Sequence, residues 1–337
     1  MAALTARQAA GQRVISSYPG LDPPASLFEN IATGATAGVI FFKENIASHA
    51  QIAGVISQLR QAQAGSPVRV PLLLMTDQEG GLVRRLPGEP VLTEKQIGQS
   101  AGPVSAAASA GHGAGQNLAG VGMNVNLAPV LDVYHSRGDF IDQYQRSYSG
   151  HPAVVSECGQ AFIEALQATG VAATIKHFPG LGAASMNQNT DIGPVTLNVP
   201  LTQLLTLDEV PYPPAIAAGV KLVMLSWAVY PALDRKRPAG LSSTNIEQEL
   251  RGRTGFTGVT ITDALEAGAL GGFGSTGQRA VSAAGAGMDL ILCSARDTSQ
   301  AETAVSALAS ALSNGQLGPD TFQAAADRVT ALRASLF

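Results

Sequence analysis

The feature that most constrains the fold is a series of eight short apolar segments. Alanine-rich helical patterns lie between most of them, including 48–64, 103–120, 154–169 and 277–287. Strands that alternate with helices predict a parallel sheet with right-handed crossovers. Eight such units in 337 residues fit a closed (β/α)8 barrel better than an open sheet. We therefore expect one α/β domain over residues 1–337, completed by a last helix at 319–336. The segments are centred near Ile15, Ile40, Leu73, Val125, Ala173, Val223, Thr260 and Leu290.

The composition supports a large core and excludes several other classes of protein. Hydrophobic residues make up 45% of the chain and charged residues only 14%, which argues against disorder. The net charge is −4 without a basic stripe, so nucleic acid is not an expected partner. No apolar run approaches the roughly 20 residues of a membrane-spanning helix. Cys158 and Cys293 lack the spacing of metal ligands and are predicted to be buried thiols.

The first residues, MAALTARQAAGQ, bear on the cellular location. They lack the basic start and the apolar core of a signal peptide. This favours a cytoplasmic protein. Export, with a leader that is absent from this sequence, is the alternative.

Polar side chains follow the apolar segments, which is where a barrel enzyme builds its active site. Lys176 and His177 stand side by side after the run Val171–Ile175 and before a glycine-rich loop. Adjacent cationic and titratable groups are costly in a core but useful at the mouth of a site. We therefore predict a site at the C-terminal ends of the strands. The other residues in such positions are Lys43, Asn45, Asp77, Glu79, Asp132, Ser226, Trp227, Asp263 and Ser294.

Asp263 is the most informative of these carboxylates. It ends the β-rich run Val259–Thr262 and precedes a helix-forming stretch. In this position it could cap the helix that follows. It could equally attack the anomeric carbon of a sugar, because retaining glycosidases use a nucleophilic carboxylate about 5–5.5 Å from a proton donor.

Several motifs together resemble glycoside hydrolase family 3. They are MTDQEGGLVRRL, NLAPVLDV, the RSY triplet, IKHFPGLG, VMLSWAVYPALD and GFTGVTITDAL, and they occur in the order that the family shows. The sequence is most similar to the single-domain bacterial β-N-acetylglucosaminidases (β-N-acetylhexosaminidases) of that family. The resemblance covers nearly the whole chain. It implies a TIM barrel, a retaining mechanism, a carbohydrate substrate, and neither a metal nor an organic cofactor.

The resemblance also implies roles for individual residues. Asp263 matches the nucleophile, and Asp77 matches the aspartate that binds sugar hydroxyls in subsite −1. Arg146, Lys176 and His177 match residues that line the same subsite. Charged side chains can orient a sugar through strong hydrogen bonds to its hydroxyls.

Each of these residues also has a structural interpretation. Asp77 could bond only to the backbone of a turn, and Lys176 with His177 could form a network beneath the glycine turn. Arg146 could pair with Asp142 or Asp132. Asp132 itself is expected to organise a loop rather than to act as a catalyst.

The sequence departs from the family pattern where the proton donor should be. The N-acetylglucosaminidases usually have a second His in the glycine turn and then an Asp-x-His pair, whose His is the general acid/base. Here the turn position is Leu181, and Asn189 falls at the last position of the Asp-x-His pair. An Asn can bond to a glycosidic oxygen, but it has no useful acid–base pKa near neutrality. Asp191 is the replacement acid/base that we consider, although it could also be a loop cap.

Two more positions differ from the pattern. Leu82 replaces the Arg that usually follows Glu-Gly-Gly, and Trp227 replaces a His. Trp227 could pack at the barrel rim. Alternatively, it could offer an aromatic surface to a sugar ring, and we include it among the substrate-binding candidates.

Three functions remain open at this point. The first and favoured one is a retaining hydrolase for terminal β-linked N-acetylhexosamine, or for β-glucose-type sugars, that forms a covalent glycosyl-enzyme on Asp263. The second is a sugar-binding homologue with weakened catalysis, because loss of a general acid typically costs about 10²–10⁴-fold in rate. The third is a transglycosidase or phosphorylase, in which an acceptor other than water completes the reaction.

Overall fold

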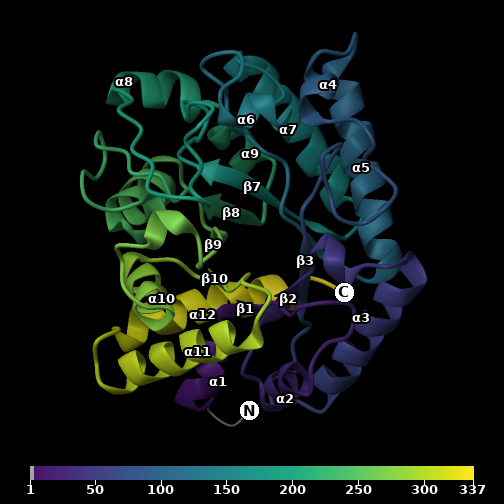
Figure 1. Ribbon diagram of the computed structural model, residues 1–337, viewed down its shortest axis with the longest axis vertical. Coiled ribbons are helices and arrows are strands. Elements are labelled where there is room, and N and C mark those ends of the chain that lie inside the picture. Colours follow the sequence, from purple (N-terminus) through teal and green to yellow (C-terminus); the bar gives the residue numbers. More distant parts are fainter. Residues whose placement is uncertain (1–3) are drawn as a thin grey trace.

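The computed structural model describes residues 4–337 and consists of a barrel of parallel strands surrounded by helices (Figure 1). The strands follow one another in the order β10-β1-β2-β3-β6-β7-β8-β9. The two ends of this order meet through a bridge between Ile261 and Leu290, whose backbone also bonds to Thr260 and Thr262 at 2.9 and 3.0 Å. The strands are β1 (Val14–Ser16), β2 (Gly38–Ile40), β3 (Leu73–Thr76), β6 (Val125–Asn126), β7 (Ala172–Phe178), β8 (Leu222–Leu225), β9 (Val259–Thr262) and β10 (Ile291–Leu292).

This arrangement confirms the predicted (β/α)8 TIM barrel. Every one of the eight apolar segments contains one barrel strand. One boundary differs from the prediction, since β7 continues through Phe178 and so includes Lys176 and His177 as strand residues. The reason is that the backbone of this segment still pairs with its neighbours, as the bridges from Lys176 to Val130 and from Phe178 to Leu225 show.

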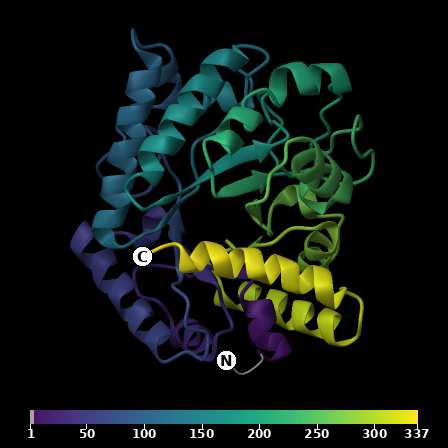
Figure 2. The same cartoon turned by 180° about the vertical axis from the view of Figure 1, so that it is seen from behind.

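The helices form the outer layer of the barrel. The chain ends in two long helices that pack beside its first one, as both views show (Figures 1 and 2). The predicted last helix ends two residues early, at Ala334. The helices are α1 (Ala6–Gly11), α2 (Ala25–Thr33), α3 (His49–Ala64), α4 (Glu94–Gly98), α5 (Pro103–Val121), α6 (Phe140–Gln143), α7 (Pro152–Gln167), α8 (Leu201–Gln203), α9 (Tyr212–Ala217), α10 (Thr276–Ala286), α11 (Thr298–Ser313) and α12 (Pro319–Ala334).

Small residues allow this outer layer to pack closely. On α5, Gly111 faces the backbone of Phe162 on α7, where an added Cβ atom would lie 2.3 Å from the Phe162 carbonyl oxygen. Only glycine fits such a close approach. The abundance of Gly and Ala in the sequence therefore has a structural consequence, because it lets helices sit near one another and near the sheet.

Alternate strand residues divide the core into two regions. Residues such as Ile15, Leu73 and Val125 point into the barrel and form one buried cluster. Their neighbours, such as Val14 and Leu74, belong to the larger cluster between strands and helices. This division follows from the two-residue period of a strand. Within residues 4–337, no helix has the length and apolar character needed to span a membrane.

Candidate active site

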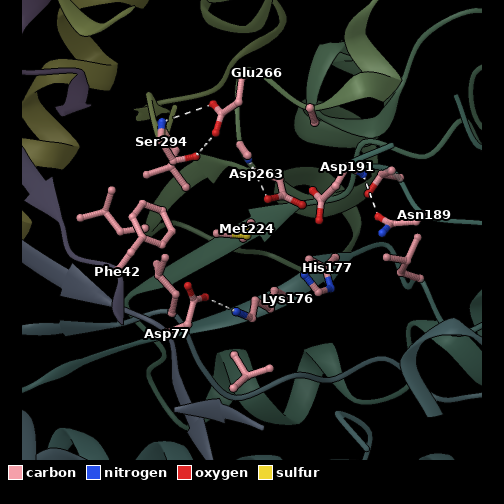
Figure 3. Close-up of a pocket in the computed structure, with 18 of the residues that line it drawn as sticks. Phe42, Asp77, Lys176, His177, Asn189, Asp191, Met224, Asp263, Glu266 and Ser294 are labelled. Atoms are coloured by element: carbon pink, nitrogen blue, oxygen red, sulfur yellow. Dashed lines mark hydrogen bonds and ion pairs between the residues drawn. The ribbon is translucent and has the colours of Figure 1, made fainter. Parts of the chain in front are cut away.

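A cavity of about 430 Å³ lies at the C-terminal ends of the barrel strands. Its walls include residues that follow β2, β3, β9 and β10 and residues at the end of β7 (Figure 3). The barrel therefore brings together most of the predicted site. The predicted residues that line the cavity are Asp77, Arg146, Lys176, His177, Asn189, Asp191, Asp263 and Ser294. The predicted residues that do not line it are Lys43, Asn45, Glu79, Asp132, Ser226 and Trp227.

Two buried cations share the carboxylate of Glu79. This residue lies on β4 (Gln78–Gly80), which forms a hairpin with β5 (Val83–Arg84) after β3. Glu79 accepts hydrogen bonds from the Arg146 guanidinium at 2.8 and 2.9 Å and lies 2.8 Å from the Lys176 ammonium. Burial favours the neutral carboxyl and would raise the pKa of Glu79. The positive charges of Arg146 and Lys176 outweigh this effect and lower the pKa to about 2. The earlier suggestion that Arg146 pairs with Asp142 or Asp132 is therefore wrong.

Asp77 is bound to side-chain cations rather than to a turn. Its carboxylate lies 2.8 Å from the Lys176 ammonium and 3.9 Å from Nε of Arg85. Burial would raise the pKa of Asp77, but these two positive charges lower it below its usual value. Asp77 is therefore an anion that lines the cavity, and it can accept hydrogen bonds from sugar hydroxyls.

Asp132 fixes the orientation of His177 from below the cavity. One carboxylate oxygen lies 2.7 Å from Nδ1 of His177, and the other accepts the backbone N–H groups of His177 and Leu181 at 3.1 and 2.7 Å. Asp132 is fully buried, so these contacts are not shared with solvent. With Nδ1 bound to a carboxylate, Nε2 is the nitrogen that remains for a ligand. Asp132 thus organises the loop, as expected.

Asp263 is not a helix cap. Its Oδ1 accepts the backbone N–H of the next residue, Ala264, at 2.7 Å, and the helix α10 begins only at Thr276, with Ser275 as its cap. The segment after Asp263 is therefore a loop at the barrel mouth. This leaves the carboxylate at the end of β9 and in the wall of the cavity.

Asp191 faces Asp263. Figure 3 shows the two carboxyl groups next to each other in the cavity, with their oxygen atoms toward one another. Part of Asp191 is exposed, but the cavity walls remove some of its hydration, and this desolvation together with the charge of Asp263 raises the pKa of Asp191. A carboxyl of this kind keeps its proton to higher pH than usual, which suits a proton donor.

The backbone around Asp191 is fixed by its neighbours. Asn189 accepts the N–H of Asp191 through its side-chain oxygen at 2.9 Å, and the Asp191 carbonyl accepts the N–H of Gly268 at 2.9 Å. The proton-donor candidate is thus tied to the loop that follows Asp263. Asn189 lines the cavity as predicted, but its side-chain oxygen already accepts the backbone N–H of Asp191.

The wall formed by Phe42, Glu266 and Ser294 was only partly anticipated (Figure 3). Glu266 accepts hydrogen bonds from the hydroxyl of Ser294 at 2.8 Å and from the amide of Gln300 at 3.0 Å. Glu266 was not singled out from the sequence. Its position three residues after Asp263, in TDALE, was the available signal.

Trp227 corrects one prediction. The residue is 1% exposed, and its indole N–H donates to the carbonyl oxygen of Ala264 at 2.8 Å. The ring packs so closely on Gly240 that a Cβ atom there would lie 2.5 Å from it. No face of the indole is open to a sugar, so Trp227 supports the Asp263 loop and is not a binding surface.

Sequence reasoning gave no role to Glu94 and Arg85. Glu94 begins α4, is 1% exposed, and accepts the N–H of Val130 at 2.9 Å. Burial and the nearby charge of Glu79 raise the pKa of Glu94 well above its usual value. Glu94 is visible in the sequence only as an ordinary charged residue, because its partner Val130 comes from another loop. Arg85 lies at the end of the same hairpin as Asp77, which is eight residues earlier in the chain, and that proximity was the available signal.

The cysteines and the possible metal ligands can be compared directly with the sequence predictions. Cys158 and Cys293 are both free and buried, as predicted. Within residues 4–337, no group of three or more His, Cys, Asp and Glu side chains is arranged to hold a metal ion.

Comparison with known proteins agrees with this geometry. Residues 14–332 match the N-terminal domain of glycosyl hydrolase family 3. An uncharacterized secreted glycosyl hydrolase from Arthroderma benhamiae is 46% identical over 329 residues, which are 97% of this chain and 93% of that protein.

Two solved structures extend the likeness. The chain superposes on a glycoside hydrolase family 3 β-N-acetylglucosaminidase from a Paenibacillus species with a TM-score of 0.92 and 36% identity, covering 99% of this chain and 63% of the other. It superposes on a β-N-acetylhexosaminidase from Beutenbergia cavernae with a TM-score of 0.88 and 32% identity, covering 99% of both. The chain therefore belongs to glycosyl hydrolase family 3 and is a glycosidase.

Proposed function

We propose that this protein is a retaining glycosidase that removes terminal β-linked N-acetylhexosamine, with β-glucose-type sugars as a second substrate class. The observation that carries the proposal is the pair of facing carboxyl groups, Asp191 and Asp263, in one cavity (Figure 3). The choice of sugar rests on the two N-acetylhexosaminidase and N-acetylglucosaminidase structures that the chain resembles.

The reaction proceeds in two balanced steps. Asp263 attacks the anomeric carbon, the glycosidic bond breaks, and Asp191 gives its proton to the departing oxygen. Asp191, now ionised, takes a proton from water as that water attacks the anomeric carbon and releases Asp263. The result is one free sugar and one alcohol, with the configuration at the anomeric carbon retained.

The buried end of the cavity holds the terminal sugar. Asp77 accepts hydrogen bonds from hydroxyls, while Lys176 and Arg146 donate to them. His177 contributes its free ring nitrogen. These groups are already ordered by Glu79 and Asp132, so little reorganisation is needed when the sugar binds.

Glu266 also lines the cavity, and it is the competing candidate for the acid/base. Its carboxylate is already engaged by hydrogen bonds from the Ser294 hydroxyl and the Gln300 amide. Asp191 instead faces the charge of Asp263, which favours the protonated form. We therefore assign proton donation to Asp191.

The location follows the secreted relative, which is 46% identical over 97% of this chain. We propose that this protein is exported, the alternative to the cytoplasmic location favoured by its first residues. Immunodetection of the protein in culture medium and in washed cells would decide between the two locations.

The test uses a 4-nitrophenyl N-acetyl-β-glucosaminide. We expect turnover by the wild-type protein and a loss of more than about 10³-fold in Asp263→Asn, because the covalent nucleophile is gone. Azide should accelerate Asp191→Ala and yield a β-glycosyl azide. Glu266→Ala is the matched control and should give no azide product.

Three other outcomes would contradict the proposal. Azide rescue of Glu266→Ala instead of Asp191→Ala would transfer the acid/base role to Glu266. Sugar binding by calorimetry without cleavage would favour the non-catalytic homologue. A rate that requires phosphate would favour a phosphorylase.

A further inference from the structure

We propose that Arg296, seated on the ring of Phe42, forms the subsite for the leaving group and selects an uncharged sugar there. This inference rests on the proposed glycosidase function. It adds a substrate class, namely oligosaccharides whose second residue is a neutral pyranose.

The exposure of the cavity walls indicates which end receives the leaving group. Lys176 and His177, at the inner end, are 2% and 5% exposed. Arg296 lines the same cavity, but its side chain is 47% exposed. Because the hydroxyls of the terminal sugar occupy the buried end, the group attached to its anomeric carbon must extend toward the exposed end, where Arg296 lies.

The Arg296 side chain is held in place and still has donors to offer. Its guanidinium carbon lies 4.2 Å from the centre of the Phe42 ring, and its Nε lies 3.4 Å from a carboxylate oxygen of Glu44. Within residues 4–337, its two terminal amino groups make no hydrogen bond to the protein. A planar guanidinium with two free amino groups can bond to two oxygen atoms of a sugar at once.

The backbone at Arg296 gives an independent reason to assign it a function. Its φ angle is +59°, in the left-handed region that non-glycine residues seldom adopt. Its N–H donates to the hydroxyl of Ser17 at 2.9 Å, and Ser17 is fully buried directly after β1. A glycine would adopt this conformation without steric cost, so the fold does not require an arginine here. Unfavourable conformations of this kind concentrate at functional sites.

The surrounding charges determine what kind of leaving group fits. Arg296 is partly balanced by Glu44, and Glu266 and Asp263 add carboxylates to the same cavity. An anionic group at this end would meet these carboxylates, whereas the hydroxyls of a neutral sugar can bond to either sign of charge. Like-charge contacts of this kind are a common source of specificity.

The experiment compares two substrates that share the terminal sugar. One is the β-1,4-linked disaccharide of N-acetylglucosamine, and the other is methyl N-acetyl-β-glucosaminide, which has no second ring. Arg296→Ala should lower kcat/KM for the disaccharide about 10–100-fold, the range expected for hydrogen bonds from a charged group. The methyl glycoside should change by less than about twofold.

Two further variants complete the design. Arg296→Lys keeps the charge but loses the planar pair of donors, so it should recover only part of the disaccharide activity. Arg60→Ala is the matched control, because Arg60 also lies over an aromatic ring, that of Phe337 at 5.8 Å, outside this cavity. It should leave both substrates unchanged.

The charge requirement is tested with a disaccharide whose second residue carries a carboxylate. We expect the wild-type protein to cleave the neutral disaccharide at least about tenfold better. A preference for the acidic substrate would overturn the selection of neutral sugars.

The remaining results also have clear meanings. Equal losses on the disaccharide and the methyl glycoside in Arg296→Ala would overturn the subsite, as would no loss on either. If the wild-type protein cleaved neither substrate, the result would contradict the proposed glycosidase function itself, and with it the subsite that depends on that function.

Discussion

The carboxylate of Glu79 lies 2.8 Å from the ammonium of Lys176, and both side chains are 2% exposed. The same carboxylate holds Arg146 through two hydrogen bonds. One buried anion therefore fixes the positions of two cations in the cavity wall. This arrangement makes Glu79 a positioning residue for the sugar-binding end of the site.

Replacing Glu79 by Gln should damage both stability and substrate binding. Lys176 and Arg146 would become neighbouring buried cations without their shared counter-ion, and removing one partner of a buried ion pair typically destabilises a protein by about 3–5 kcal/mol. We expect a lower unfolding midpoint in urea and a higher KM for the nitrophenyl glycoside.

Glu247→Gln is the control for this change. Glu247 is 49% exposed and lies 3.8 Å from Arg251, so its loss should alter stability by less than about 1 kcal/mol. If Glu79→Gln unfolded at the same urea concentration as the wild type, the ion pairs of Glu79 with Lys176 and Arg146 would not contribute to stability.

The pH dependence of kcat/KM should reveal Asp191. As the proton donor, Asp191 must be protonated, and desolvation and the charge of Asp263 raise its pKa. Activity should therefore persist above the usual pKa of an aspartate and fall on the alkaline side as Asp191 loses its proton. Asp191→Asn should remove this alkaline limb when an activated nitrophenyl leaving group is used. An unchanged alkaline limb in that variant would assign the titration to another group.

Replacing Asp132 by Asn should disturb His177 without removing it. The new amide would face Nδ1 of His177 in place of a carboxylate and would favour the other ring tautomer. We expect kcat/KM to fall by roughly 10–100-fold, less than the effect of a comparable change in a catalytic triad. The tautomer can be followed by nitrogen NMR of the imidazole.

Asp208→Asn provides a matched comparison for Asp132→Asn. Asp208 is also fully buried and lies 2.8 Å from a histidine, His135, but neither residue lines the cavity. The Asp208→Asn variant should lower the stability of the protein while leaving kcat/KM within a few-fold of the wild type. Equal catalytic losses in the two variants would show that any buried Asp–His pair of this chain has the same effect.

Trp227→Phe distinguishes support of a loop from contact with the sugar. The substitution removes the hydrogen bond from the indole to Ala264 and should destabilise the protein by about 1–3 kcal/mol. Because the ring is buried behind the Asp263 loop, kcat should fall by a few-fold and KM should stay the same. A large increase in KM alone would restore Trp227 as a sugar-binding surface.

Much of the fold and part of the site could be predicted from local sequence patterns. The apolar segments identified each barrel strand because a short run of suitable residues is enough to form a strand. Asp77, Lys176 and Asp263 could be grouped in advance, since the ends of parallel strands meet at one edge of the barrel. Their motifs also carried the family resemblance, which the comparisons confirm.

Other features depended on contacts between distant parts of the chain. Glu79 and Arg146 are 67 residues apart, and nothing near either one indicates that they form an ion pair. Trp227 was mistaken for a binding surface because its burial depends on Gly240 and on the loop after Asp263. Local patterns do not specify which loops will pack together over the barrel.

The sequence by itself thus determined the barrel, the order of its strands and the nucleophile candidate. Only the tertiary structure placed Asp191 opposite Asp263 and Arg296 over Phe42. The physical reason is that strands follow from short-range patterns of burial. The relative positions of loop side chains follow from closure of the whole barrel, which brings charges from separate loops into one desolvated cavity.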